Sequence, residues 1–159
     1  MEQFLIFIAG GQKFALGIKS ISKIIEYLEP QKIPEVSDFV QGVIPYNDSV
    51  LPVISLSNRL YGVKENATKD NRVIIAIWKE KEIGFIVEDI DGIRAIQDEE
   101  IELSNKDFKI SKDYIMGYIK RGKDIVVILD INKIFTLEHE LELLELNEML
   151  EDEEIVEEK

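Results

Sequence analysis

The chain of 159 residues contains no cysteine and a single histidine, which excludes several chemistries at the outset. Without thiols there can be no disulfide, no thiolate metal site and no cysteine nucleophile. The histidine, His139, lies in an acidic segment without a neighbouring serine or cysteine, which favours a surface residue over a catalytic base. No nucleophile elbow, P-loop or dinucleotide fingerprint occurs. The sequence therefore predicts a protein that is not an enzyme and uses no cofactor.

Patterns for metal binding and membrane spanning are missing as well. The stretch EDIDG at 88–92 is similar to the start of a calcium loop, but the later ligands and the closing glutamate are absent, so we expect no metal site. No apolar run reaches the roughly 18 residues that a membrane span needs, and the residues up to Ile8 lack a basic start and a cleavage site. We expect a soluble cytoplasmic protein.

Positive charge is scarce, and the negative charge is concentrated at one end. The net charge is −13, and residues 137–159 carry ten Glu, one Asp and one Lys, or −10, which leaves −3 for residues 1–136. A nearly neutral body with an acidic tail argues against nucleic-acid binding. Six leucines of the tail fall on two helical stripes: Leu137, Leu141 and Leu144, and Leu143, Leu146 and Leu150. We expect a helix to about residue 150 that docks one stripe on the body, followed by a disordered acidic end.

The remaining sequence contains an internal duplication. DFVQGVIPYNDSVLPVISLSNRL from Asp38 aligns without a gap on DYIMGYIKRGKDIVVILDINKIF from Asp113, which matches Gly42 with Gly117. Similarly, FLIFIAG from Phe4 aligns on VIIAIWK from Val73, and FALGIKSI from Phe14 on IGFIVEDI. Two halves of about 70 residues each favour two equivalent small modules over a solenoid.

Both halves have the composition of β-strands. Short runs rich in Ile, Val, Phe and Leu, separated by turn residues, occur at 4–9, 14–18, 42–46, 50–56, 73–78, 83–87, 115–119 and 125–131. Their regular spacing predicts small all-β barrels. Helical turns are expected only near Ser20–Tyr27 and Ser57–Tyr61, besides the tail.

Two of the chain's four prolines lie within one predicted hairpin, GVIPYNDSVLPVI from Gly42. Proline has no N–H to donate, so Pro45 and Pro52 predict a sheet edge. Such an edge is either protected against aggregation or used to bind another chain. The equivalent hairpin in the second half has no proline, which favours a binding role.

Five blocks in this order resemble the CheW family of chemotaxis coupling proteins: FALGIKSISKII from Phe14, IPEVSDFVQGVI from Ile33, SVLPVISLSNRLYG from Ser49, IGFIVEDIDGI from Ile83 and YIMGYIKRGKDIVVILDINKIF from Tyr114. The resemblance extends from about residue 3 to 136. It implies two SH3-like five-stranded β-barrels that share a hydrophobic core. Residues 1–136 would form the CheW-like domain, with a first barrel at about 10–68 and a second at about 70–136. Whether the termini are exchanged between the barrels is left open, and residues 137–159 would form the acidic helix and tail.

The resemblance also implies a function. The family couples chemoreceptors to a CheA-type histidine kinase in bacterial chemotaxis, as a non-enzymatic cytoplasmic scaffold at membrane-associated receptor arrays. The expected partners are the regulatory domain of the kinase and the cytoplasmic tip of a methyl-accepting chemoreceptor. The alternative is a divergent paired-barrel binding module in an auxiliary, non-chemotaxis two-component pathway.

Two binding surfaces follow from the resemblance. The family docks one barrel end to end on the kinase's regulatory domain, which implies a kinase-binding hairpin with Val43, Pro45, Tyr46, Asn47, Asp48 and Pro52. The family seats the receptor between the barrels, and Ile21, Ile24 and Ile25 have the i, i+3, i+4 spacing of a helix beside that groove. Burial in the core is the alternative for these isoleucines.

The hairpin departs from the usual family pattern. Where the family commonly has Asn-Leu-Arg-Gly, this chain has Pro45 to Asp48, and Ser55 and Ser57 replace an Asp and an Arg. The family commonly has Glu at the position of Lys23 and Arg at that of Asn47, whose neighbour here is the acidic Asp48. We therefore predict a charge pair of reversed sign between Lys23 and Asp48, within the chain or through a partner. Independent drift of the two positions is the alternative.

Overall fold

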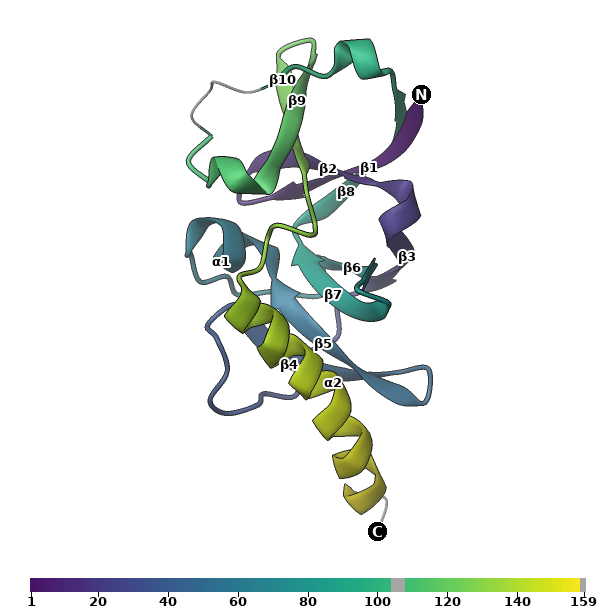
Figure 1. The fold of residues 1–159 in the computed structure, drawn as a ribbon, viewed down its shortest axis with the longest axis vertical. Coiled ribbons are helices and arrows are strands. Elements are labelled where there is room, and N and C mark those ends of the chain that lie inside the picture. Colours follow the sequence, from purple (N-terminus) through teal and green to yellow (C-terminus); the bar gives the residue numbers. More distant parts are fainter. Residues whose placement is uncertain (104–107, 158–159) are drawn as a thin grey trace.

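The computed structural model describes residues 1–103 and 108–157, and its strands form two five-stranded sheets (Figure 1). Sheet 1 has the order β8 (Asp89–Ile96), β1 (Glu2–Ala9), β2 (Gln12–Gly17), β10 (Asp124–Leu129) and β9 (Ile115–Arg121). Sheet 2 has the order β3 (Ile21–Glu26), β6 (Arg72–Trp78), β7 (Lys81–Val87), β5 (Ser49–Ser55) and β4 (Val40–Tyr46). This arrangement fits the expected SH3-like subdomains.

The helices are short, except for the last one. They comprise α1 (Leu56–Tyr61), α2 (Leu137–Glu157) and three 3-10 turns, η1 (Ile18–Ser20), η2 (Asp98–Glu100) and η3 (Lys112–Tyr114). Within the described ranges, no helix is both long enough and apolar enough to cross a membrane.

The duplication of the sequence is reproduced in the order of the strands. Exchanging each strand for its counterpart in the other half, β1 for β6, β2 for β7, β3 for β8, β4 for β9 and β5 for β10, converts one sheet order into the other. Each sheet nevertheless combines both halves, because hairpin β1–β2 pairs with β8 and β10, and hairpin β6–β7 pairs with β3 and β5. The sheets therefore do not coincide with the contiguous ranges 10–68 and 70–136.

Alternation along the strands divides the apolar side chains among three clusters. Leu5 and Phe7 on β1 face a core shared by both sheets, whereas Phe4 and Ile6 face a separate cluster inside sheet 1. In sheet 2, Ile74 joins the shared core and its neighbours face a third cluster. Strands that bury both faces must be apolar throughout, which explains the continuous Ile/Val runs in the sequence.

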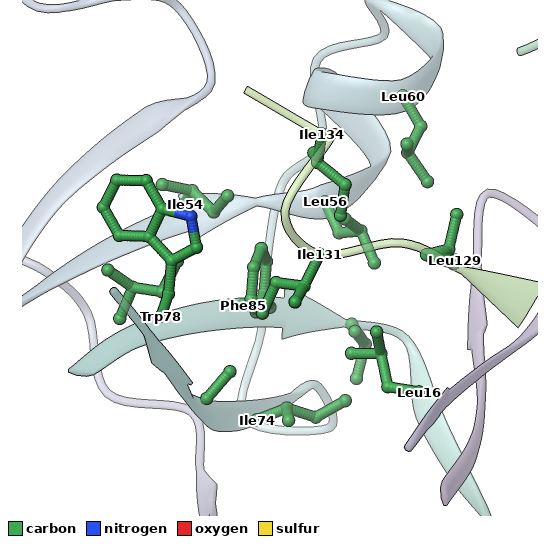
Figure 2. Packing of buried hydrophobic residues seen from close by; sticks show 14 of the residues in the cluster. Leu16, Ile54, Leu56, Leu60, Ile74, Trp78, Phe85, Leu129, Ile131 and Ile134 are labelled. Carbon is green, nitrogen blue, oxygen red and sulfur yellow. The ribbon is translucent and has the colours of Figure 1, made fainter. Parts of the chain in front are cut away.

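Side chains from both sheets meet in the shared core (Figure 2). Trp78 and Phe85 of sheet 2 lie near Ile131 and Ile134, which follow β10, while Leu16 of sheet 1 approaches from the other side. All five side chains are more than nine-tenths buried, and all belong to this cluster. The two sheets are thus held together by ordinary apolar burial, worth about 25 cal/mol per Å² of apolar surface.

The outer edges of β4 and β9 are each covered by one residue of a preceding loop. Gln31 exchanges two backbone hydrogen bonds with Val43, and Glu102 exchanges two with Tyr118. A Cβ atom on Gly42 would collide with the carbonyl oxygen of Gln31, and one on Gly117 would lie 2.9 Å from that of Glu102. The glycine that the duplication matches is therefore required in both halves by the same close crossing.

The helical turn expected near Ser20–Tyr27 is wrong, because η1 ends at Ser20 and the residues that follow form strand β3. Each of the eight predicted apolar runs overlaps a strand, although the runs 14–18, 50–56 and 125–131 extend one or two residues past the strand's end. The two strands that sequence analysis missed are β3 and β8. These two are counterparts in the duplication. Both have several exposed polar residues, so they lack the continuous apolar run by which the others were recognised.

Helix α2 docks on sheet 2 mainly through one of the two predicted leucine stripes, although Leu144 of the other stripe also packs partly against the shared core. Leu143 and Leu146 are 0% and 4% exposed, whereas Leu137 and Leu141 are 71% and 55% exposed. Glu142 accepts hydrogen bonds of 2.7 Å from both the backbone N–H and the hydroxyl of Ser37. The helix continues to Glu157, beyond the expected end at about residue 150.

His139, which we expected to be a surface residue, is partly buried and contacts Thr136 where α2 begins. Its backbone N–H donates to the Thr136 hydroxyl, and its ring Nδ1 accepts from the backbone N–H of Thr136, both at 3.2 Å. Its ring packs edge-on against Phe39, with 4.7 Å between the centroids. Burial, followed by the nearby Arg59 charge, lowers the pKa of His139, and a neutral ring is the form that can accept at Nδ1.

Candidate protein-binding surfaces

The β4–β5 hairpin presents only part of the expected kinase-binding set to solvent. Its turn residues Asn47 and Asp48 are exposed, with φ of 49° and 60°, as a two-residue type I′ turn requires. Pro45 is exposed and Tyr46 is partly so. Val43 and Pro52, in contrast, are buried in the body of the sheet. The surface available at this hairpin is therefore its tip, Pro45–Asp48.

The two prolines occupy ladder positions that lose no hydrogen bond. The backbone N–H and C=O of Val43 point outward to Gln31. Because the direction of these groups alternates along a strand, the backbone nitrogen of Pro45, two residues later, points outward as well. Pro45 thus lies on an edge strand, as expected. Pro52 is opposite Val43 on β5, an inner strand, so the expectation of an edge is wrong there. Its missing N–H faces β7 just before their pairing begins at Val53.

Exposed isoleucines occupy equivalent places on the two strands β3 and β8. Continuing the alignment of FALGIKSI on IGFIVEDI matches Ile24 with Ile93. Ile24 is 37% exposed and Ile93 is 54% exposed. Ile24 lies opposite Ile74 and Ile93 opposite Leu5, and both of these partners belong to the shared core. The two isoleucines therefore extend the apolar surface of the core to the exterior, one from each sheet.

The three isoleucines predicted for the receptor groove do not lie on one face. Because β3 is a strand, Ile24 and Ile25 point to opposite sides. Ile25 packs against the cluster inside sheet 2, and Ile21 packs against the shared core. Ile24 is the exposed member of the set. Sequence analysis missed Ile93, although the duplication supplied the signal that would have identified it.

The predicted charge pair is not formed within the chain. Lys23 lies on β3 and Asp48 in the turn that follows β4, and β3 and β4 are the two opposite edge strands in the order of sheet 2. Both residues are exposed, and the ion pairs among the described residues include neither of them. A pair mediated by a partner stays a prediction.

A buried hydroxyl replaces the carboxylate that the family resemblance led us to expect at position 55. Ser55 is 1% exposed; its oxygen accepts from the Asn58 N–H at 3.2 Å and so caps α1. The same hydroxyl donates to Glu65 at 2.6 Å. Burial raises the pKa of Glu65, with a smaller contribution from Glu88, while the hydrogen bond from Ser55 opposes the shift.

Replacing Glu65 with Gln should raise the free energy of unfolding at pH 7 by less than about 1 kcal/mol, since the site is only partly desolvated. The amide oxygen can still accept from Ser55, and no charge has to be buried. The raised pKa of Glu65 means that its stabilising contribution is complete below the unfolded pKa and is lost as the pH rises through the folded pKa. Urea denaturation at pH 7 and 4.5 should therefore show the advantage of Gln shrinking at the lower pH; an advantage that grew there would contradict this.

Arg59 on α1 contacts aromatic residues from both halves of the chain. Its guanidinium carbon lies 4.9 Å from the ring centroid of Tyr114 and 5.5 Å from that of Phe39, two residues that the duplication matches. Its Nη2 donates to the Tyr114 hydroxyl at 2.7 Å. The duplication did not predict this contact, because the counterpart of Arg59 in the second half is the buried Ile134.

Nothing in these surfaces resembles a catalytic or metal centre. In the described ranges, no group of three or more His, Asp or Glu side chains is placed to hold a metal ion. Two packed five-stranded sheets, with a protruding hairpin and apolar residues on edge strands, are the features of a β-rich protein-interaction module.

Comparison with known proteins identifies the module. A family model described as the CheW-like domain matches residues 3–139, and the chain belongs to this family. It is 27% identical over 141 residues to the chemotaxis protein CheW of Bacillus subtilis, covering 86% of this chain and 88% of that one. It is 29% identical over 123 residues to CheW of Thermotoga maritima, covering 77% and 80%.

The fold agrees with that of a solved family member. The crystal structure of the scaffolding protein TtCheW from Thermoanaerobacter tengcongensis superposes with a TM-score of 0.78 at 23% sequence identity. The match covers 87% of this chain and 90% of that one. At this identity the likeness shows the shared fold.

Proposed function

We propose that the protein is a non-enzymatic cytoplasmic adaptor that couples chemoreceptors to a CheA-type histidine kinase at membrane-associated receptor arrays. The observation that carries this proposal is the equivalent placement of Ile24 and Ile93, which continue the shared core to the surface from both sheets. Relatives named as chemotaxis and scaffolding proteins support it.

Each partner has its own surface in this proposal. A receptor's cytoplasmic tip packs its apolar side chains on Ile24 and Ile93, because exposed apolar residues beside a core are a favourable docking site for an amphipathic helix. The kinase's regulatory domain contacts the hairpin tip, Pro45–Asp48. The two surfaces belong to different strands, so one adaptor can hold both partners at once.

The proposal is tested by isothermal titration calorimetry with a purified receptor-tip fragment and the regulatory domain of the kinase from the same genome. We expect each to bind alone, and each to bind with little change when the other is present. If both fail to bind while the protein is folded, the coupling function is wrong. Binding instead to the kinase of an auxiliary two-component system would favour the divergent module.

A double-mutant cycle tests the hairpin and the reversed charge pair together. We expect Lys23→Glu and Asp48→Lys each to weaken binding of the regulatory domain by about 0.5 to 1 kcal/mol, the usual size for exposed charges. The double variant should recover much of the loss if the partner links the two charges. Strictly additive losses would show that the two positions act independently.

A further inference from the structure

Sheet 1 contains a pocket that belongs to neither proposed surface. Its volume is about 290 Å³, and three apolar side chains from the cluster inside the sheet, Ile6, Ile119 and Val126, form part of its wall. Arg94 lines it from β8. Ile93 next to it lies opposite Leu5 of the shared core and so points to the other side of the sheet, because neighbouring residues of a strand point to opposite sides.

The charged side chains around this pocket are unevenly paired. Lys13 lies 2.9 Å from an oxygen of Asp124 and 3.4 Å from one of Asp91. The hydrogen bond to Asp124 raises the pKa of Lys13, so its charge stays engaged with these two carboxylates. Arg94 and Arg121 also line the pocket, and in the described part of the chain neither forms an ion pair. Arg121 makes only a long contact of 3.4 Å to the carbonyl oxygen of Ala95.

The corresponding pocket of sheet 2 has the opposite character. Its lining includes Tyr46, Leu51 and Glu82, which the duplication matches with Arg121, Val126 and Lys13. Glu80 lines it as well. Only the pair Lys13 and Glu82 exchanges a cation for an acid directly, and Lys81 also lines the second pocket. The charged lining nevertheless changes from three cations and two carboxylates in sheet 1 to two carboxylates and one cation in sheet 2. Such a difference selects partners by charge, because a carboxylate attracted by one pocket is repelled by the other.

We propose that the pocket of sheet 1 is a docking site for an acidic segment of a protein partner. Arg94 and Arg121 bind the partner's carboxylates, since a planar guanidinium can donate two parallel hydrogen bonds to a carboxylate. Ile6, Ile119 and Val126 contact the aliphatic stem of the inserted side chain. This site lies outside the hairpin tip and the isoleucine surface, so it adds a third contact to the proposed adaptor.

An NMR titration of the ¹⁵N-labelled protein with acetyl-Glu-Ala-Glu-amide tests the site. We expect saturable shifts at residues lining the pocket, and no such shifts with acetyl-Gln-Ala-Gln-amide. Arg94→Gln and Arg121→Gln should each raise the Kd at least about 10-fold, and Arg94→Lys less, because an ammonium lacks the planar fork. Lys69→Gln removes the same charge from an exposed loop and should leave the Kd unchanged.

Three results would overturn the proposal. Equal shifts with both peptides would show that carboxylates are not recognised. Arginine variants that remain folded and bind like Lys69→Gln would place the binding elsewhere. Displacement of the peptide by inorganic phosphate at equal or lower concentration would define a general anion site in place of a docking site for acidic side chains.

Discussion

Ile24→Ser is expected to weaken binding of the receptor-tip fragment at least about 10-fold without altering the circular dichroism spectrum. The side chain is 37% exposed and has an apolar neighbour in the shared core, so a docked helix would bury what solvent now reaches. Central apolar contacts of an interface commonly cost more than 1 kcal/mol each when truncated. Ile93→Ser, at the equivalent place on β8, should weaken binding similarly, and the binding isotherm of each variant measures the effect.

Ile25→Ser supplies a matched control on the same strand. Ile25 packs against the cluster inside sheet 2, so its loss should lower the free energy of unfolding by about 2 kcal/mol while the folded fraction still binds the receptor tip. If Ile24→Ser unfolded the protein and Ile25→Ser removed binding alone, the assignment of the two faces of β3 would be reversed. Unchanged binding by both Ile24→Ser and Ile93→Ser would remove the receptor surface from the proposal.

Most of the fold could be predicted from the sequence because its strands bury both faces. Continuous Ile/Val runs identify the inner strands such as β6 and β7, and the duplication predicts two equivalent units. Strands β3 and β8 were missed because each lies at an edge and has several exposed polar residues that interrupt the apolar run. For Ile21, Ile24 and Ile25, spacing alone fitted a helix. Because the alignment of the two halves matches Ile24 with Ile93, both segments should have the same structure, and a strand fits both sequences.

The combination of strands from both halves in each sheet was not predictable from the sequence. It depends on the parallel pairs β2–β10 and β5–β7, which join segments far apart in the chain. Local propensity contains no information about such pairing. The same holds for the candidate sites. Pro45–Asp48 could be recognised as a hairpin tip. Arg94 and Arg121, in contrast, line one pocket because the two opposite edge strands of sheet 1, β8 and β9, come near each other.

The acidic C-terminal segment is similarly ambiguous in the sequence, because either leucine stripe could dock. The structure buries Leu143 and Leu146 and leaves Leu137 and Leu141 exposed. Two polar contacts accompany the buried stripe. Glu142 satisfies the N–H of Ser37, and Glu140 lies 2.9 Å from Lys79 at the β6–β7 turn. Docking the other stripe would forfeit both contacts.

Leu143→Ala is expected to lower the free energy of unfolding by about 2 to 4 kcal/mol. The side chain is 0% exposed and belongs to the same core as Ile54, Trp78 and Phe135, so truncation leaves a cavity among groups fixed by two sheets. Leu141→Ala makes the identical chemical change on the exposed side of α2 and should cost less than about 0.5 kcal/mol.

Urea denaturation followed by tryptophan fluorescence measures both variants, because the single tryptophan, Trp78, lies in the core that α2 covers. A large loss for Leu143→Ala with an unchanged m-value would show that α2 unfolds together with the sheets as one cooperative unit. A small loss for Leu143→Ala, equal to that of Leu141→Ala, would mean that α2 contributes little to the stability of the core. The helix would then be an appendage that detaches before the sheets unfold, and its polar contacts with Ser37 and Lys79 would not hold it in place.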